Sequence, residues 1–215
     1  MVEIATNKNL SKYLFLEIFL LFVLTPIVLT LPITIVLKIS YVLLGFLYIS
    51  WMSFKTRGYN KEKASIKLSR KVVLSISFRF IIIALATITF LYFYDKALLF
   101  DVVLNKPMLW LKFSGIYIVF SVIPQELIYR TFFVKRYQGL LKNKTVFILV
   151  NSVLFSFAHI WFQSWIVLSF TFIGSILFIS TYLKTKSTWV VILEHSLYGV
   201  WLYTVGYGAL FMFPV

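Results

Sequence analysis

The sequence contains no cysteine, only two histidines and only seven acidic residues among its 215 positions. The lack of cysteine excludes disulfide bonds, a thiol nucleophile and cysteine-ligated zinc or iron–sulfur centres. Charged residues make up 13% of the chain, well below the share in soluble domains, whereas 61% of residues are hydrophobic. A soluble core of this size cannot bury so much apolar sequence, and disorder requires low hydrophobicity. The composition therefore predicts an integral membrane protein.

Long apolar runs divide the chain into seven expected membrane spans. Most approach the ~20 residues that an α-helix needs to cross a bilayer, and they lack the alternation of barrel strands. The expected spans are residues 12–31, 33–54, 72–94, 110–134, 145–162, 165–183 and 188–212. We therefore expect an all-α, multi-pass transmembrane bundle that forms one integral membrane domain.

The distribution of positive charge predicts how this bundle is oriented. With the N-terminus inside, fifteen Lys and Arg residues fall on the inner side and four, Lys38, Lys96, Lys106 and Lys112, on the outer side. Because inner loops collect positive charge, we expect the N-terminus inside and the C-terminus outside, in a bacterial cytoplasmic membrane. The basic loop 55–71 is either an interfacial amphipathic stretch or a solvated loop. Topology and contact with anionic lipid account for the excess charge, so no nucleic-acid partner is expected.

Ionisable residues inside the spans are the candidates for function, because a charge in hydrocarbon is costly. They are Glu17, Arg79, Glu126, Arg130, His159, Glu194 and His195. Glu17 and Arg79 lie near the ends of their spans, so we expect them to reach the interface in structural roles. The remaining five come from three spans and include both histidines.

Spacing suggests how these residues are used. Glu126 and Arg130 are four residues apart and share a helix face, which fits a buried ion pair. Glu194 and His195 point about 100° apart on a helix, so only one of them can face a given cavity while the other packs against a neighbouring helix. A carboxylate with an imidazole can activate water, and a second imidazole can donate to an oxyanion. These groups suffice for hydrolysis of an amide bond without cysteine.

The arrangement resembles the CAAX protease and bacteriocin-processing (CPBP, or Abi) family of intramembrane endopeptidases. The family pattern is Glu-Glu-x-x-x-Arg, Phe-x-x-x-His and His-x-x-x-Asn or a small residue. This chain has Gln125-Glu126-x-x-x-Arg130, Phe155-x-x-x-His159 and His195-x-x-x-Gly199. The resemblance covers residues 110–212. We accordingly expect residues 1–109 to hold N-terminal helices and the basic loop, and residues 110–215 to hold the core catalytic helices.

The resemblance implies a helical membrane fold with a polar cavity, peptide-bond hydrolysis, and a hydrophobic peptide or protein as substrate. It places Glu126, His159 and His195 at catalytic positions, with Glu126 and His159 activating water and His195 supporting the oxyanion. The expected supporting residues are Gln125, Arg130, Phe155, Glu194 and Gly199. No cofactor is expected, and membrane lipids are the other expected partner.

Two departures from the family pattern leave alternatives open. Gln125 cannot accept a proton at neutral pH, and Gly199 lacks the amide donor of asparagine. Either Glu126 or Glu194 is then the base, or the protein is an inactive member that binds peptides or gives immunity to a bacteriocin. A metal-assisted reaction with Glu126, His159 and His195 as ligands ranks second to a metal-free one. A channel or transporter ranks third as a function class, because the chain shows no inverted repeat.

Overall fold

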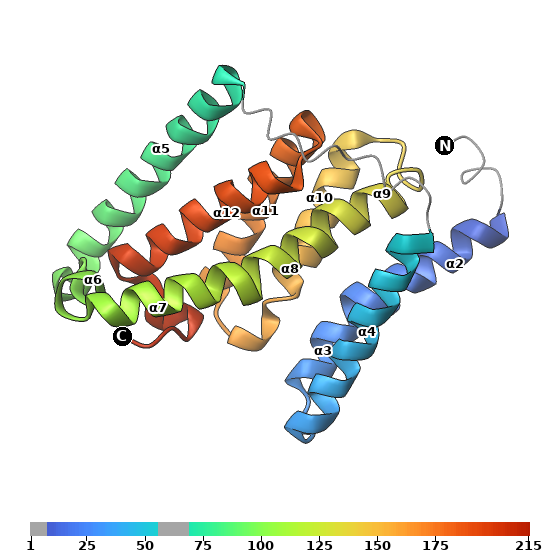
Figure 1. The fold of residues 1–215 in the computed structure, drawn as a ribbon, viewed down its shortest axis with the longest axis horizontal. Coiled ribbons are helices and arrows are strands. Elements are labelled where there is room, and N and C mark those ends of the chain that lie inside the picture. The colour runs from blue at the N-terminus through green and yellow to red at the C-terminus, as the bar shows by residue number, and fades with distance from the viewer. Residues whose placement is uncertain (1–7, 56–68) are drawn as a thin grey trace. The chain divides into compact units, whose positions relative to one another are not determined.

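A computed structural model describes residues 8–55 and 69–215 of the chain (Figure 1). Every regular element in these residues is helical, which confirms the all-α prediction. Five helices are long and apolar enough to cross a membrane: Asn9–Thr30, Ile35–Lys55, Arg70–Tyr94, Pro107–Tyr137 and Trp165–Thr185. The protein is therefore a multi-pass membrane protein.

Two of the seven expected spans, those of residues 145–162 and 188–212, are not among these five helices. Helix α10, Lys144–Phe157, has 14 residues and is roughly 21 Å long at 1.5 Å per residue, against ~30 Å of hydrocarbon. Helix α12, Thr188–Leu202, has 15 residues and continues into a π-helical turn, η7, Tyr203–Tyr207. Gly206 breaks that turn with φ of 126°, which an L-residue with a side chain rarely adopts. That all seven segments cross the membrane, and that the N-terminus lies inside and the C-terminus outside, stay predictions.

Contacts group the described residues into two compact units, which are considered separately. The first unit combines residues 8–55 with residues 127–180. Its elements are α2 (Lys8–Ile18), η1 (Phe19–Leu24), α3 (Thr25–Thr30), α4 (Ile35–Lys55), η5 (Leu127–Phe132), α9 (Phe133–Tyr137), α10, η6 (Ile160–Phe162) and most of α11 (Trp165–Thr185). Helices α3 and α4 lie side by side as a hairpin (Figure 1). Leu31 turns the chain with extended backbone because it precedes Pro32, which disfavours helix at that position.

Aromatic rings form the core of the first unit. Phe22, which is 1% exposed, packs edge-on against Tyr129 at 5.2 Å and against Phe133 at 5.1 Å between ring centroids. Tyr129 in turn meets Phe155 of α10 at 5.1 Å. Edge-to-face rings gain electrostatic energy beyond the burial of their area. This cluster fixes η5 between the N-terminal helices and α10.

Glu17, expected in a structural role near a span end, is held by side chains of the first unit. The residue is 5% exposed and accepts hydrogen bonds from Tyr48 at 2.6 Å and from Arg136 Nε at 3.1 Å. A carboxylate removed from water keeps its charge only where donors surround it, and these two residues supply them. Glu17 thus has the expected structural role, with partners that are distant in sequence.

The second unit combines residues 69–126 with residues 181–215. Its elements are α5 (Arg70–Tyr94), η3 (Lys96–Leu98), α6 (Asp101–Asn105), α7 (Pro107–Tyr117), η4 (Ile118–Val122), α8 (Ile123–Glu126), the end of α11, α12, η7 and η8 (Gly208–Phe211). Helix α12 packs against α5, η4 and α8. Trp201 donates to Thr87 Oγ1 at 3.0 Å, which links α12 to the middle of α5. These contacts place the polar residues Glu194 and His195 of α12 near two different helices, α5 and α8.

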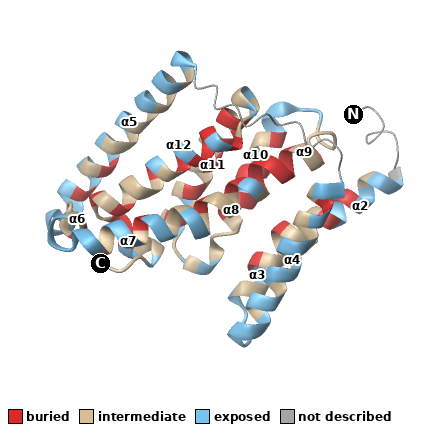
Figure 2. Ribbon diagram, in the orientation of Figure 1, coloured by how far each residue is buried: buried red, intermediate tan, exposed pale blue. Residues whose placement is uncertain are grey.

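Large apolar side chains cover the surfaces of α4 and α5. Only 6% of the most apolar window of each helix is buried, against 39% for α11, and Figure 2 shows the difference. Lys55 lies over the Trp51 ring at 5.0 Å, at the end of α4. Aromatic and basic residues at helix ends are typical anchors at the membrane interface. The exposed faces of α4 and α5 therefore fit contact with lipid.

Candidate active site

Glu126 and His195 form a buried pair within the second unit. Glu126, at the end of α8, is 0% exposed, and its Oε1 lies 2.8 Å from Nδ1 of His195 on α12. A carboxylate oxygen can only accept in this contact, so Nδ1 of His195 carries the proton and donates it. Nε2 is then the ring nitrogen that can take or give a proton. The carboxylate thus orients the imidazole, an arrangement suited to acid–base chemistry.

Irregular helix geometry positions Glu126. The four-residue helix α8 stands between the π-helical segments η4 and η5. Pro124 within it has no N–H to donate to the carbonyl four residues earlier. π-Helical turns inside α-helices are frequent at functional sites, because they re-aim side chains against the regular period.

Tyr117 is a neighbour of His195 that the sequence analysis missed. Its ring meets the imidazole edge-on, with centroids 6.1 Å apart and planes at 81°. A Cβ atom on Gly199, one turn after His195, would lie 2.5 Å from Tyr117 Cζ and clash with its hydroxyl. Tyr117 therefore occupies the space that a side chain at position 199 would fill. A lone tyrosine in an apolar span gave no signal by which the sequence could single it out.

Glu194 faces a different helix from His195, as their 100° separation predicts. Its Oε1 accepts from Arg79 Nη1 at 3.1 Å and from the Tyr198 hydroxyl at 2.9 Å. The Glu194 side chain is 0% exposed and that of Arg79 is 21% exposed. Arg79, expected in a structural role, forms an ion pair that joins α5 to α12. Glu194 was a candidate base, and the structure shows it held by these two donors.

Arg130 lies in the first unit and is fully buried there. Its guanidinium donates to Asn151 Oδ1 at 2.6 Å and to Ser175 Oγ at 3.2 Å. The Phe155 ring stacks against it, with 4.8 Å between Cζ and the ring centroid. Asn151 donates in turn to the Tyr129 carbonyl at 3.0 Å. Arg130 thus joins η5, α10 and α11.

His159 lies just beyond the end of α10, not inside a helix as expected. The helix ends at Phe157, and His159 has φ of −100° and ψ of 9°. Its backbone N–H donates to the Ser156 carbonyl, and its Nδ1 donates to the Phe155 carbonyl at 2.8 Å. Carbonyls in the last turn of a helix lack intrahelical partners, and the imidazole supplies one. The Phe-x-x-x-His spacing therefore fixes the His159 tautomer and leaves the lone pair on Nε2.

Gln125, the first departure from the family pattern, is held by its own helix. Its Nε2 donates to Ser121 Oγ at 3.0 Å, one turn earlier. Its Oε1 is buried and has no hydrogen-bond partner among the described residues. An amide at this place can orient a polar group, and it cannot accept a proton.

The expected site residues divide between the two units. The second unit holds Gln125, Glu126, Glu194, His195 and Gly199, and the first holds Arg130, Phe155 and His159. The structure brings Glu126 and His195 together, whereas one cavity shared by all these residues stays a prediction. No group of three His, Cys, Asp or Glu side chains in residues 8–55 and 69–215 could hold a metal ion.

Residues 107–201 match the family model described as type II CAAX prenyl endopeptidase Rce1-like. Over these residues the chain is similar to this family. The match contains the Glu126–His195 pair, Arg130 and His159, and it confirms the resemblance inferred from the three motifs. The Rce1-like family is a family of membrane proteases. Neither curated proteins nor solved structures gave a match.

Proposed function

We propose that the protein is an intramembrane endopeptidase that hydrolyses a peptide bond of a membrane-associated peptide or protein. The observation that carries the proposal is the 2.8 Å contact between Glu126 Oε1 and His195 Nδ1. The carboxylate of this pair is 0% exposed, so bulk water does not screen its effect on the imidazole. The match of residues 107–201 to a protease family supports the same reaction.

The proposed reaction needs no covalent intermediate with the enzyme. A water molecule loses a proton to the Glu126–His195 pair or to His159 while its oxygen bonds to the carbonyl carbon. The carbonyl oxygen becomes an oxyanion, and protonated imidazole or a hydroxyl donates to it. The C–N bond then breaks, and the leaving nitrogen receives the proton that the water lost. No cofactor enters this scheme.

The Tyr117 hydroxyl is the proposed oxyanion donor in place of the amide that Gly199 lacks. It lies beside the His195 ring and in the space of a residue-199 side chain. A phenol donates a hydrogen bond while staying neutral, which suits an apolar site. Loss of one oxyanion donor costs about 100- to 1,000-fold in kcat. Tyr117→Phe should therefore lower kcat by about that factor and leave KM nearly unchanged.

The decisive experiment is cleavage of a quenched peptide library by protein in nanodiscs, with prenylated and unprenylated peptides compared. We expect Glu126→Gln, His195→Gln and His159→Gln to lose cleavage, while Lys112→Gln, at an exposed position of α7, keeps it. Thermal unfolding of each variant separates loss of chemistry from loss of fold. Cleavage by a well-folded Glu126→Gln variant would overturn the assignment of Glu126.

A second candidate is an inactive family member that binds peptides or gives immunity to a bacteriocin. Gln125 favours it, because the family's first glutamate is replaced by an amide that bonds to Ser121. This reading gains support if the wild-type protein cleaves no peptide in the library and still binds one of them at micromolar concentration.

A further inference from the structure

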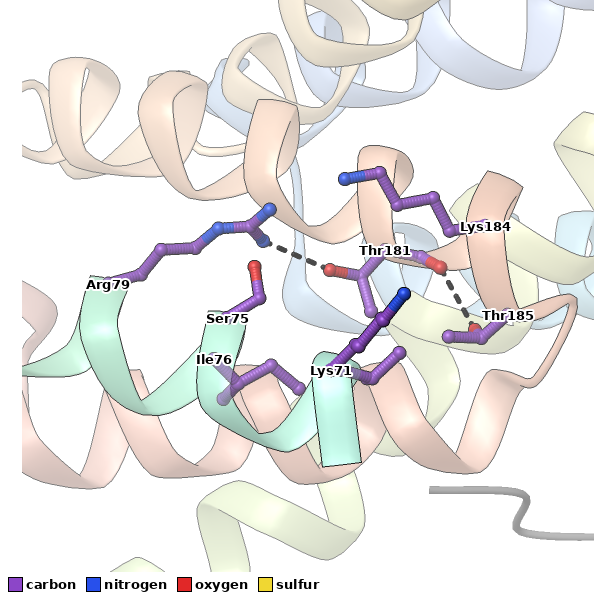
Figure 3. Close-up of a pocket in the computed structure, with 8 residues that line it drawn as sticks. Lys71, Ser75, Ile76, Arg79, Thr181, Lys184 and Thr185 are labelled. Carbon is purple, nitrogen blue, oxygen red and sulfur yellow. Dashed lines mark hydrogen bonds between the residues drawn. The ribbon is translucent and has the colours of Figure 1, made fainter. Parts of the chain in front are cut away.

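A small cavity in the second unit gathers positive charge. The cavity has a volume of about 140 Å³ and lies between the first turns of α5 and the last turn of α11 (Figure 3). Its lining includes three cationic side chains and three hydroxyls, which come from Lys71, Ser75, Arg79, Thr181, Lys184 and Thr185. Since one water takes about 30 Å³, the space fits a group of four or five heavy atoms.

Regular spacing places these side chains together. Lys71, Ser75 and Arg79 follow one another at intervals of four residues and so share one face of α5. Figure 3 shows these side chains extending toward the end of α11, with the Ser75 hydroxyl beside the Arg79 guanidinium. Lys71 is also in the first turn of α5, where the helix dipole favours a negative charge.

The cavity has more hydrogen-bond donors than the described residues have acceptors to bind them. Arg79 forms its two bonds to described residues, with Thr181 and Glu194, through Nη1 alone. The guanidinium has further N–H donors on Nε and Nη2, and Arg79 lines the cavity. Lys71 and Lys184 are exposed and form no hydrogen bond or ion pair with described residues. Glu194 balances one of the three cations, so the cavity keeps a surplus of about two positive charges.

We propose that this cavity binds a phosphate group, carried by an anionic phospholipid headgroup or by a soluble phosphate. Phosphate oxygens accept from guanidinium, ammonium and hydroxyl donors, all of which line the cavity. The cavity lies where the apolar helices α5 and α11 end, and helix ends of this kind meet the headgroup region. This inference is independent of the proposed proteolysis.

The test measures lipid binding by purified full-length protein, using native mass spectrometry and thermal unfolding. The probes are phosphatidylglycerol, zwitterionic phosphatidylcholine and inorganic phosphate. We expect saturable binding of phosphatidylglycerol that is stronger than that of phosphatidylcholine. The variant Lys71→Gln/Lys184→Gln keeps the side-chain stems and should bind about 20-fold more weakly, since each basic residue near an anionic surface contributes roughly fivefold.

The control variant is Lys142→Gln/Lys144→Gln, which removes the same charge from exposed positions outside the cavity. We expect this control to bind phosphatidylglycerol as the wild type does. Equal weakening of both double variants, or equal binding of the two lipids by the wild type, would overturn the proposal. Competition by millimolar inorganic phosphate would support the phosphate site and assign it to a soluble ion, whereas its absence beside retained lipid binding assigns it to the headgroup.

Discussion

Glu194 and His195 are adjacent residues with different partners, and those partners define what each can do. The Glu194 carboxylate accepts hydrogen bonds from Arg79 and Tyr198, and the charged guanidinium of Arg79 forms an ion pair with it. The His195 imidazole is oriented by the contact of its Nδ1 with Glu126. The direction in which each side chain leaves α12 decides this difference.

Glu194→Gln should destabilise the protein without removing its chemistry. Arg79, with a side chain 21% exposed, would lose its anionic partner, and breaking such a pair costs about 3 kcal/mol. Thermal unfolding in detergent should report the loss, and replacement of both residues, Glu194→Leu with Arg79→Met, should recover part of it. A variant that keeps its melting temperature and loses cleavage would instead identify Glu194 as the base.

Gly199→Ala should destabilise the protein because its Cβ meets Tyr117. Overpacking of this kind typically costs about 1–3 kcal/mol. Gly115→Ala is the matched control, because a Cβ there has no atom within 4 Å and α7 is helical at that position. We expect the control to gain up to about 1 kcal/mol, as Ala replaces Gly in a helix. Equal melting temperatures of the two variants would show that Tyr117 does not fill the space beside residue 199.

At the scale of elements, one buried guanidinium holds three helices of the first unit. Arg130 donates to α10 through Asn151 and to α11 through Ser175 from two different nitrogens. An ammonium group has neither the planar fork nor the reach to serve both acceptors. The segment η5 therefore depends on arginine and not simply on positive charge.

Arg130→Lys should lower the free energy of unfolding by about 2 kcal/mol, the usual worth of a lost hydrogen bond to a charged group. The control is Arg70→Lys, at an exposed position in the first turn of α5, which should change stability by less than about 0.5 kcal/mol. Chemical unfolding in mixed micelles measures both. An Arg130→Lys variant as stable as the control would contradict the bridging role.

The lengths of α10 and α12 could be read only in part from the sequence. Apolar composition predicted both helices, whereas the end of α10 at Phe157 has no glycine or proline to mark it. Tertiary contacts hold that end, since Ser156 Oγ donates to the Leu168 carbonyl at 2.7 Å. His159 follows this end and lies outside the helix.

At the scale of the whole molecule, the absence of cysteine makes topology directly measurable. Single cysteines introduced at Asn60 and Val103 should react with impermeant reagents from opposite sides, with residue 60 inside, because positive charge gathers in loop 55–71. Position 60 lies outside the described residues. Labelling of both positions from the same side would contradict the orientation.

Position 163 tests whether the short helix α10 crosses the membrane. If all seven segments cross, Gln163→Cys reacts from outside and Lys186→Cys from inside. Gln163 follows the 14-residue α10, so reaction from inside would reduce the number of crossings and place His159 near the inner surface. Unlabelled wild-type protein is the background control.

The sequence by itself determined the membrane class, the helical fold and the resemblance to a protease family over residues 107–201, because hydrophobic runs and motif spacing are properties of neighbouring residues. It also identified Glu126 and His195 as candidates, since any ionisable group in an apolar span is unusual. The tertiary structure alone decided the partners: His195 for Glu126, Arg79 for Glu194, and Asn151 with Ser175 for Arg130. These contacts join residues from 21 to 115 positions apart. Local pattern cannot predict them, because only the packing of helices brings such distant side chains within hydrogen-bond distance.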